Sequence, residues 1–363
     1  MRTQTIFIAL LSAVTSALPC GQGPAESCSN GIHGEEPSLP LPGHILNQFG
    51  EGTWVENIAV RPNGDLIVST STPNASVYEV DQPWLESPTV SLVHTFDDHV
   101  DRLIGIGASS PDKFVVVGSR FDSTTESGMP INGTWAVLEI DFTGDDCPPS
   151  ARLIAAMPDA FLLQRVAALP WNPTLLISSS FLKSPGVVWR VGTRTEEYSL
   201  AVKDLPEMQT SLIGAPVGIN GIKICGNNPW WVNSDRFTLY RLEIDQTGAA
   251  ALGAKPEAIA YYQDAVLDDF CFGSHNEPIV WATRNADNGL LAFDFDGRGA
   301  VVLGNGTDHV FPTPTACALS SGGPGNLMYV TGRDKTLPLA NGSFVIGGGV
   351  RAFDVGGFWL GDE

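Results

Sequence analysis

Pairs of mostly polar residues recur along this chain, each placed directly before an apolar stretch with the composition of a β-strand. Carboxylates and amides of this kind can bind a divalent cation, exchange protons or hold an organic substrate by directed hydrogen bonds. The first members of the six pairs are Glu56, Asp101, Gln164, Asn220, Asp268 and Pro314. The second members are Asn57, Arg102, Arg165, Gly221, Asp269 and Thr315.

The spacing of the pairs predicts the fold. The first apolar residue after each pair lies at positions 58, 103, 166, 222, 270 and 316, so the repeat runs from 45 to 63 residues. Each repeat continues through a turn into a second apolar strand, and a repeat of this length built only of strands is typical of a propeller blade. We therefore predict an all-β chain, a single six-bladed β-propeller of four-stranded blades, in which the pairs line one mouth of the central channel.

The two ends of the repeat region predict how the ring closes. The last repeat has no fourth strand, whereas the first is preceded by a spare strand at residues 44–49. Pairing of this N-terminal strand with the last blade would cover two open sheet edges. We expect the ring to be closed in this way, with residues 43–363 forming the propeller.

The first 17 residues have the features of a secretory signal peptide. Arg2 precedes an apolar run that is far shorter than the roughly 20 residues needed to span a bilayer, and small residues follow it. Residues 18–42 are predicted to be an irregular leader. We expect a secreted glycoprotein with no membrane insertion. Its four Asn-x-Ser/Thr sites are Asn74, Asn132, Asn305 and Asn341.

Composition limits the partners and the metal chemistry. The six cysteines allow three disulfide bridges; we expect Cys20 to pair with Cys28, and Cys271 and Cys317 to be small buried residues. No C-x-x-C spacing occurs, which argues against a structural zinc site. The formal net charge of −20 repels phosphate backbones and anionic membranes, so we expect no nucleic-acid partner.

Three blade openings resemble the gluconolactonase-like (senescence-marker-protein type) family of six-bladed propellers. They are Glu56-x-x-x-Val60-x-Pro62-x-Gly64-x-Leu66, Asn220-Gly221-Ile222 and Asp268-Asp269-Phe270. The resemblance implies that Glu56, Asn220 and Asp268 bind one divalent cation, Ca²⁺, Mg²⁺ or Mn²⁺, which activates water against a lactone. The chain departs from the family pattern at Gln164, which replaces an Asn, and at Asp269, which replaces a Gly.

Within this group the chain is most similar to secreted fungal propellers of secondary metabolism, on its signal peptide and the opening from Glu56 to Gly64. These include the cofactor-free hetero-Diels–Alderases of tropolonic sesquiterpenoid biosynthesis. The similarity implies small hydrophobic organic substrates, a quinone-methide-type polyketide and a terpene, held in the channel. Arg102 and Arg165 would then neutralise the acids.

Three functions are therefore open at this point. The leading hypothesis is a cofactor-free cycloaddition enzyme, acting as a monomer or homodimer; the alternatives are a metal-dependent lactonase and a ligand-binding propeller without catalysis. As catalytic residues we predict Glu56, Asp101, Gln164, Asn220 and Asp268. As substrate-binding residues we predict Asn57, Arg102, Arg165, Asp269 and Thr315.

Overall fold

A computed structural model describes residues 39–122, 124, 128–144, 148–182, 184–273, 278–304, 313–320, 326–339, 342–358 and 360. The expected signal peptide and most of the leader lie outside these residues. So do Cys20, Cys28, Cys147, Asn305 and Asn341. Of the predicted glycosylation sites that are described, Asn74 and Asn132 are exposed.

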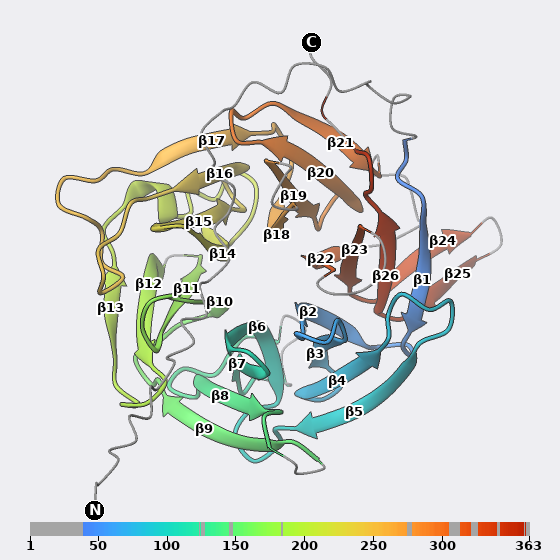
Figure 1. The fold of residues 1–363 in the computed structure, drawn as a ribbon, viewed down its shortest axis with the longest axis horizontal. Helices are drawn as coiled ribbons and strands as arrows, with labels where there is room; N and C mark the ends of the chain where they lie inside the picture. Colours follow the sequence, from blue (N-terminus) through green and yellow to red (C-terminus); the bar gives the residue numbers. More distant parts are fainter. Residues whose placement is uncertain are drawn as a thin grey trace, which may run out of the picture.

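Six four-stranded antiparallel sheets surround a central axis, which confirms the predicted six-bladed β-propeller (Figure 1). Blade 1 contains β2 (Trp54–Val60), β3 (Leu66–Thr72), β4 (Ser76–Asp81) and β5 (Thr89–Thr95). Blade 2 contains β6 (Arg102–Ser110), β7 (Lys113–Ser119), β8 (Ala136–Asp141) and β9 (Ser150–Ala156). Blade 3 contains β10 (Leu163–Ala168), β11 (Thr174–Phe181), β12 (Ser184–Gly192) and β13 (Tyr198–Val202).

The remaining blades follow the same plan after a short 3₁₀ turn, η1 (Pro206–Met208). Blade 4 contains β14 (Ile219–Cys225), β15 (Asn228–Asn233), β16 (Thr238–Arg241) and β17 (Glu257–Tyr261). Blade 5 contains β18 (Leu267–Phe272), β19 (Ile279–Arg284), β20 (Gly289–Asp294) and β21 (Gly299–Leu303). Blade 6 contains β22 (Pro314–Leu319), β23 (Leu327–Gly332), β26 (Gly349–Asp354) and β1 (Gly43–Gln48).

The N-terminal strand closes the ring as predicted. Strand β1 pairs antiparallel with β26, from Gly43 opposite Phe353 to Gln48 opposite Gly349, and forms the outer edge of blade 6 (Figure 1). Because this strand comes from the other end of the propeller, it joins the last blade to the first. Closure covers the edge of β26, which would otherwise present unpaired backbone groups.

One hairpin was not predicted from the sequence. Strands β24 (Lys335–Leu339) and β25 (Gly342–Ile346) pair with each other between β23 and β26. They extend from blade 6 beside β1 (Figure 1). The insertion lies between the second and third strands of the blade, where it leaves the four-stranded sheet intact.

The core lies between neighbouring blades. The second strand of each blade is apolar and buried on both faces, as in Leu66, Ile67 and Val68, because one face packs on each adjacent blade. This explains why these strands read as continuous apolar runs rather than as alternating patterns. Cys225, Cys271 and Cys317 are buried in this core, as expected for Cys271 and Cys317.

A β-bulge interrupts the register at the start of all six inner strands. In blade 3, for example, Leu163 pairs with Ser179 and Val166 pairs with Ile177, so Gln164 and Arg165 lie between the paired residues. Comparable register shifts occur in the other inner strands. A bulge re-aims side chains, and the first members of four pairs, Glu56, Gln164, Asn220 and Asp268, line the channel cavity.

The bulge corrects the predicted opening of blade 2. There the shift falls between Leu103 and Gly105, so Ile104 and Gly105 occupy the positions that were assigned to Asp101 and Arg102. Apolar Leu103 and Ile104 were taken as the start of the strand interior, although they belong to the channel mouth. The structural equivalents of the polar pairs therefore include one apolar pair.

Gly105 must be a glycine because the backbone of blade 3 lies against it. A Cβ added at Gly105 would lie 2.1 Å from the Gln164 carbonyl oxygen. We expect Gly105→Ala to lower the free energy of unfolding by about 1–3 kcal/mol, since the blades must move apart. Gly50→Ala is the control, because no atom lies within 4 Å of a Cβ there; equal thermal melting temperatures of the two variants would contradict the assignment.

Candidate active site in the central channel

The predicted mouth of the channel is a cavity of about 460 Å³ to which all six blades contribute. Its polar lining at the inner strands consists of Glu56, Gln164, Asn220 and Asp268. All but Asp268 are less than 9% exposed. The rest of the wall is largely apolar and includes Ile104, Phe121, Met129, Leu162, Phe181, Pro216, Val217 and Val266.

A second group of lining residues was missed from the sequence. These residues stand at or just after the end of the second strand in each blade: Ser71, Phe121, Phe181, Ser234, Asn285 and Arg333. Because the first two strands of a blade are antiparallel, the end of the second meets the start of the first at the same mouth. Applied to the predicted strands, that rule would have found them.

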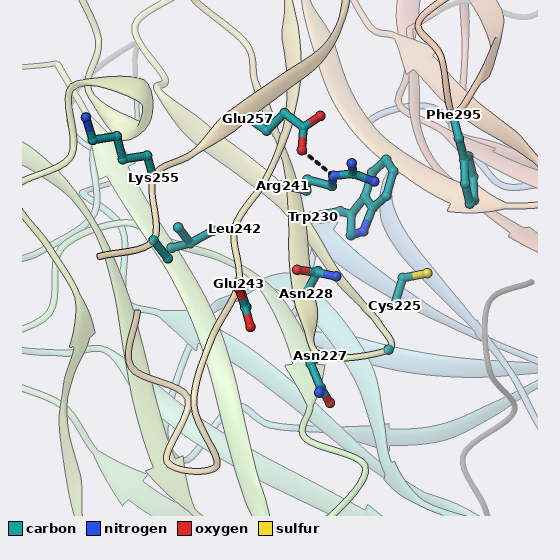
Figure 2. Close-up of a pocket in the computed structure, with 12 residues that line it drawn as sticks. Cys225, Asn227, Asn228, Trp230, Arg241, Leu242, Glu243, Lys255, Glu257 and Phe295 are labelled. Carbon is teal, nitrogen blue, oxygen red and sulfur yellow. Dashed lines mark hydrogen bonds and ion pairs between the residues drawn. The ribbon is translucent and has the colours of Figure 1, made fainter. Parts of the chain in front are cut away.

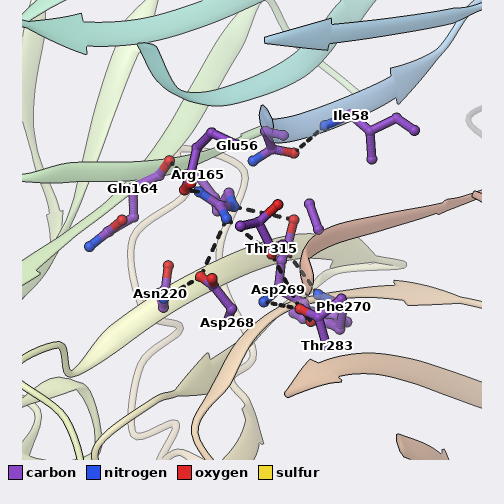
Figure 3. A network of polar contacts seen from close by, with 12 residues as sticks. Glu56, Ile58, Gln164, Arg165, Asn220, Asp268, Asp269, Phe270, Thr283 and Thr315 are labelled. Carbon is purple, nitrogen blue, oxygen red and sulfur yellow. Dashed lines mark hydrogen bonds and ion pairs between the residues drawn. The ribbon is translucent and has the colours of Figure 1, made fainter. Parts of the chain in front are cut away.

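Arg165 lies at the centre of the ring, fully buried (Figure 3). Its Nη1 lies 3.0 Å from Glu56 Oε1, its Nη2 lies 3.4 Å from Asp268 Oδ1, and its Nε lies 3.3 Å from Asp269 Oδ2. It also donates to the carbonyl oxygens of Ile104 and Thr315, at 3.1 and 3.3 Å. One side chain from blade 3 thus binds blades 1, 2, 5 and 6 together.

The charges at this centre do not balance. Glu56, Asp268 and Asp269 contact Arg165, and the only other cation bound to them among the described residues is Lys223, 3.2 Å from Asp269. Burial raises the pKa of Glu56 to about 8, with the Asp268 charge adding to the effect and Arg165 opposing it. Burial likewise raises the pKa of Asp268 to about 6. Glu56 is therefore mainly a neutral acid at pH 7.

Asp268 is held by amides on both oxygens. Asn220 Nδ2 donates to Asp268 Oδ1 at 2.9 Å, and Asn285 Nδ2 donates to Asp268 Oδ2 at 3.0 Å. Asn220 Nδ2 also donates to Ser234 Oγ, 3.1 Å away. These two contacts fix the orientation of the Asn220 amide, so that its Oδ1 is the free end.

Three buried oxygens of residues that line the cavity have no hydrogen-bond partner: Glu56 Oε2, Ser71 Oγ and Asn220 Oδ1. The Trp54 side chain, which also lines the cavity, lies close enough to the Glu56 carboxyl to lower its pKa against the effect of burial. A buried unsatisfied polar atom costs about 1–3 kcal/mol, which a ligand can recover. Protonated Glu56 offers an O–H donor and Asn220 offers an acceptor. The floor of the cavity thus suits a ligand that carries both an acceptor and a donor oxygen.

The other predicted site residues occupy different places. Asp101 is exposed and accepts hydrogen bonds from the Phe121 backbone N–H at 3.0 and 3.1 Å, outside the cavity lining. Asn57 is buried and accepts from the Ile58 N–H at 2.8 Å. Thr315 is buried, and its hydroxyl donates to the Val55 carbonyl oxygen at 2.9 Å. These three residues brace the mouth rather than line it.

Two arginines line the mouth above the polar floor. The Arg102 guanidinium lies 4.6 Å from the centre of the Phe121 ring, and the Arg333 guanidinium lies 4.1 Å from that of Trp54. A Cβ added at Gly128 would lie 2.7 Å from Arg102 Nη2, so this loop covers the guanidinium closely. The flat cation–aromatic pairs provide firm surfaces on either side of the cavity.

The residues do not fit the divalent-cation site implied by the gluconolactonase resemblance. Glu56 Oε1 and Asp268 Oδ1 already accept hydrogen bonds from the buried Arg165 guanidinium. Asp268 Oδ2 accepts one from Asn285. A metal ion among these groups would lie next to a fixed positive charge in a low-dielectric region.

A larger hollow of about 550 Å³ lies elsewhere, lined mainly by residues of β15 to β17 and the adjoining turns (Figure 2). Its main charged contact is internal: Arg241 Nε lies 2.7 Å from Glu257 Oε2. The Arg241 guanidinium also lies over the buried Trp230 ring, 5.5 Å from its centre. None of the predicted site residues lines this hollow.

Sequence comparison places these observations in a family. No family model matches the chain. It is 45% identical over 317 residues to a protein of Phoma sp named "Putative hetero-Diels-Alderase", a match that covers 83% of this chain and 89% of the relative. It is also 38% identical over 362 residues to "Putative hetero-Diels-Alderase asR5" of Sarocladium schorii, covering 94% and 90%. The chain belongs to the hetero-Diels-Alderase family.

Solved structures show the same fold at low sequence identity. A calcium-binding regucalcin from Agrobacterium tumefaciens is 14% identical, with a TM-score of 0.55 over 87% of this chain and 96% of that one. A protein titled a putative gluconolactonase is also 14% identical, with a TM-score of 0.54 over 88% and 96%. This hetero-Diels-Alderase family member therefore shares the propeller architecture of the gluconolactonase-like proteins, as its blade openings predicted.

Proposed function

We propose that this protein catalyses a hetero-Diels–Alder cycloaddition without a metal or an organic cofactor. An O=C–C=C heterodiene of a quinone-methide-type polyketide adds across the C=C bond of a terpene. One C–O and one C–C bond form, and no atom leaves. The observation that carries the proposal is the floor of the cavity, where an unpartnered acid oxygen and an unpartnered amide oxygen belong to a cavity with a largely apolar wall.

The polar floor would bind the heterodiene. Its carbonyl oxygen gains negative charge as the bonds form, and the neutral Glu56 O–H is the donor placed to stabilise that charge. A ring hydroxyl of the same substrate would donate to Asn220 Oδ1. Arg165 holds Glu56 from below and so fixes the direction of the acid.

The apolar wall would bind the terpene. Ile104, Phe121, Leu162 and Phe181 line the same cavity as the polar floor and supply its apolar surface. Holding the two reactants in contact in the reactive orientation converts a bimolecular step into an effectively unimolecular one. The cavity volume is within the range of ordinary small-molecule sites.

The proposed setting is the secretory pathway, with the protein a secreted glycoprotein that acts as a monomer or homodimer on small hydrophobic substrates. The amino-terminal 17 residues and the exposed Asn74 and Asn132 support this. Among the described residues, no helix is long and apolar enough to cross a membrane. The high negative charge disfavours nucleic acid as a partner.

The test is adduct formation from a quinone methide generated in situ and a sesquiterpene alkene, followed by chiral liquid chromatography. We expect one stereoisomer in excess over the uncatalysed mixture, at a rate that EDTA leaves unchanged. The same protein should not hydrolyse a sugar lactone. Loss of activity in EDTA, restored by Ca²⁺, Mg²⁺ or Mn²⁺, would favour the lactonase alternative, and binding without turnover of either substrate would favour the binding propeller.

A further inference from the structure

One loop combines a firmly anchored base with an exposed apolar tip. The loop Thr210–Val217 connects η1 to β14, and its residues Ala215, Pro216 and Val217 line the channel cavity. At its tip, Leu212 and Ile213 are 55% and 76% exposed. Contiguous exposed apolar surface can mark a ligand-binding groove, and here the exposed side chains belong to a loop that also lines a cavity.

The buried carboxylate of Asp235 anchors the base of the loop. Oδ2 accepts from the backbone N–H and the hydroxyl of Ser211, at 2.5 and 2.9 Å. Oδ1 accepts from the N–H groups of Gly214 and Ala215, at 2.8 and 3.1 Å. The hydrogen bonds hold the pKa of Asp235 down to about 2, against the effect of burial, so the anchor is charged at all ordinary pH values.

Packing adds a second restraint on the loop. A Cβ added at Gly214 would lie 2.2 Å from the Phe237 ring, so the backbone there rests directly on the ring. The Leu182 N–H donates to the Pro216 carbonyl oxygen at 2.6 Å, which brings the half-exposed Leu182 next to the cavity wall. The apolar tip therefore belongs to a fixed loop whose next residues, Ala215 to Val217, line the cavity.

We propose that the loop Thr210–Val217 binds the terpene partner of the cycloaddition, with Leu212 and Ile213 extending the apolar wall past the mouth and Asp235 positioning the loop. This rests on the proposed function. A terpene is the favoured occupant because the same loop lines the cavity. Two or three side chains are far fewer than a stable dimer interface of about 800 Å² per partner needs, and the net charge of −20 opposes an anionic membrane.

The test measures binding of a sesquiterpene hydrocarbon by equilibrium dialysis, and the kinetics of adduct formation. We expect the double variant Leu212→Ser/Ile213→Ser to raise both the Kd and the KM for the sesquiterpene by roughly tenfold, with kcat and the KM for the quinone methide unchanged. Leu252→Ser is the control, since Leu252 is also exposed but its loop, between β16 and β17, contributes no residue to the cavity lining. Unchanged Kd in the double variant would overturn the proposal.

Asp235 is tested as a positioning residue. Asp235→Ala should speed hydrogen exchange at the Gly214 and Ala215 amides and raise the KM for the sesquiterpene, whereas Asp235→Asn, which keeps one acceptor oxygen, should restore part of both. Faster exchange with an unchanged KM would overturn the positioning role of Asp235.

If the wild type binds the sesquiterpene but forms no adduct, the proposed function fails and the loop assignment stands. The loop assignment would also be overturned if the double variant lost a dimer or vesicle binding seen in the wild type while its Kd for the sesquiterpene stayed unchanged.

Discussion

Replacing Arg165 by methionine should lower the free energy of unfolding by about 3–5 kcal/mol at neutral pH. The variant keeps an unbranched apolar stem but leaves three buried carboxyl groups without their shared guanidinium. It also removes the donors to the Ile104 and Thr315 carbonyl oxygens, so contacts to four other blades are lost together. Equilibrium urea unfolding at pH 7.5 measures the loss.

The control for this variant is an exposed ion pair. The Lys203 and Asp204 side chains are 61% and 83% exposed and their charged groups lie 3.7 Å apart, so Lys203→Met should cost less than about 1 kcal/mol. The deficit of Arg165→Met should shrink at acidic pH, because the carboxyl groups left behind can then take up protons. Equal losses in the two variants, or a deficit that grows on acidification, would contradict the central role of Arg165.

The propeller could be predicted from the sequence because its repeat is a local pattern. Each blade is recognised in the sequence by a polar pair, a turn and a continuous apolar strand. The missing fourth strand of the last blade predicted closure by β1, which pairs with β26. The hairpin β24–β25 was missed because an insertion inside a blade interrupts no such repeat. Blade 2 was misaligned because its channel-facing residues, Ile104 and Gly105, carry no polar signal.

The site was predictable only as far as the inner strands. Glu56, Gln164, Asn220 and Asp268 line the cavity as their positions implied. The sequence could not predict which acids would form ion pairs with Arg165, because Glu56 is 109 residues and Asp268 is 103 residues away from it along the chain. The cavity wall from the loop Thr210–Val217 depends on the Asp235 anchor, a long-range contact with no repeat to reveal it.

The rate acceleration should depend on Glu56 in its neutral form. At each pH the catalysed rate is compared with the uncatalysed rate, and we expect the ratio to fall as the pH rises through about 8, where Glu56 loses its proton. Glu56→Ala should lower the ratio by roughly 10²–10³ at pH 7, as expected for removal of one donor to a developing oxyanion. Glu257→Gln, at an exposed carboxylate, should leave the profile unchanged.

The variant Glu56→Gln separates donation from ionisation. Its amide keeps an N–H donor but cannot ionise, so the ratio of catalysed to uncatalysed rate should stay within roughly tenfold of the wild type. That ratio should also no longer fall at alkaline pH.

The free energy of unfolding should depend on pH through the same group. In the wild type the pKa of Glu56 is higher folded, about 8, than its ordinary value of 4.5. The folded state thus binds more protons between these values, and stability falls as pH rises across them. Glu56→Gln should remove that slope. A variant as inactive as Glu56→Ala, or a wild-type rate that rises with pH, would show that the carboxylate and not the acid is the active form.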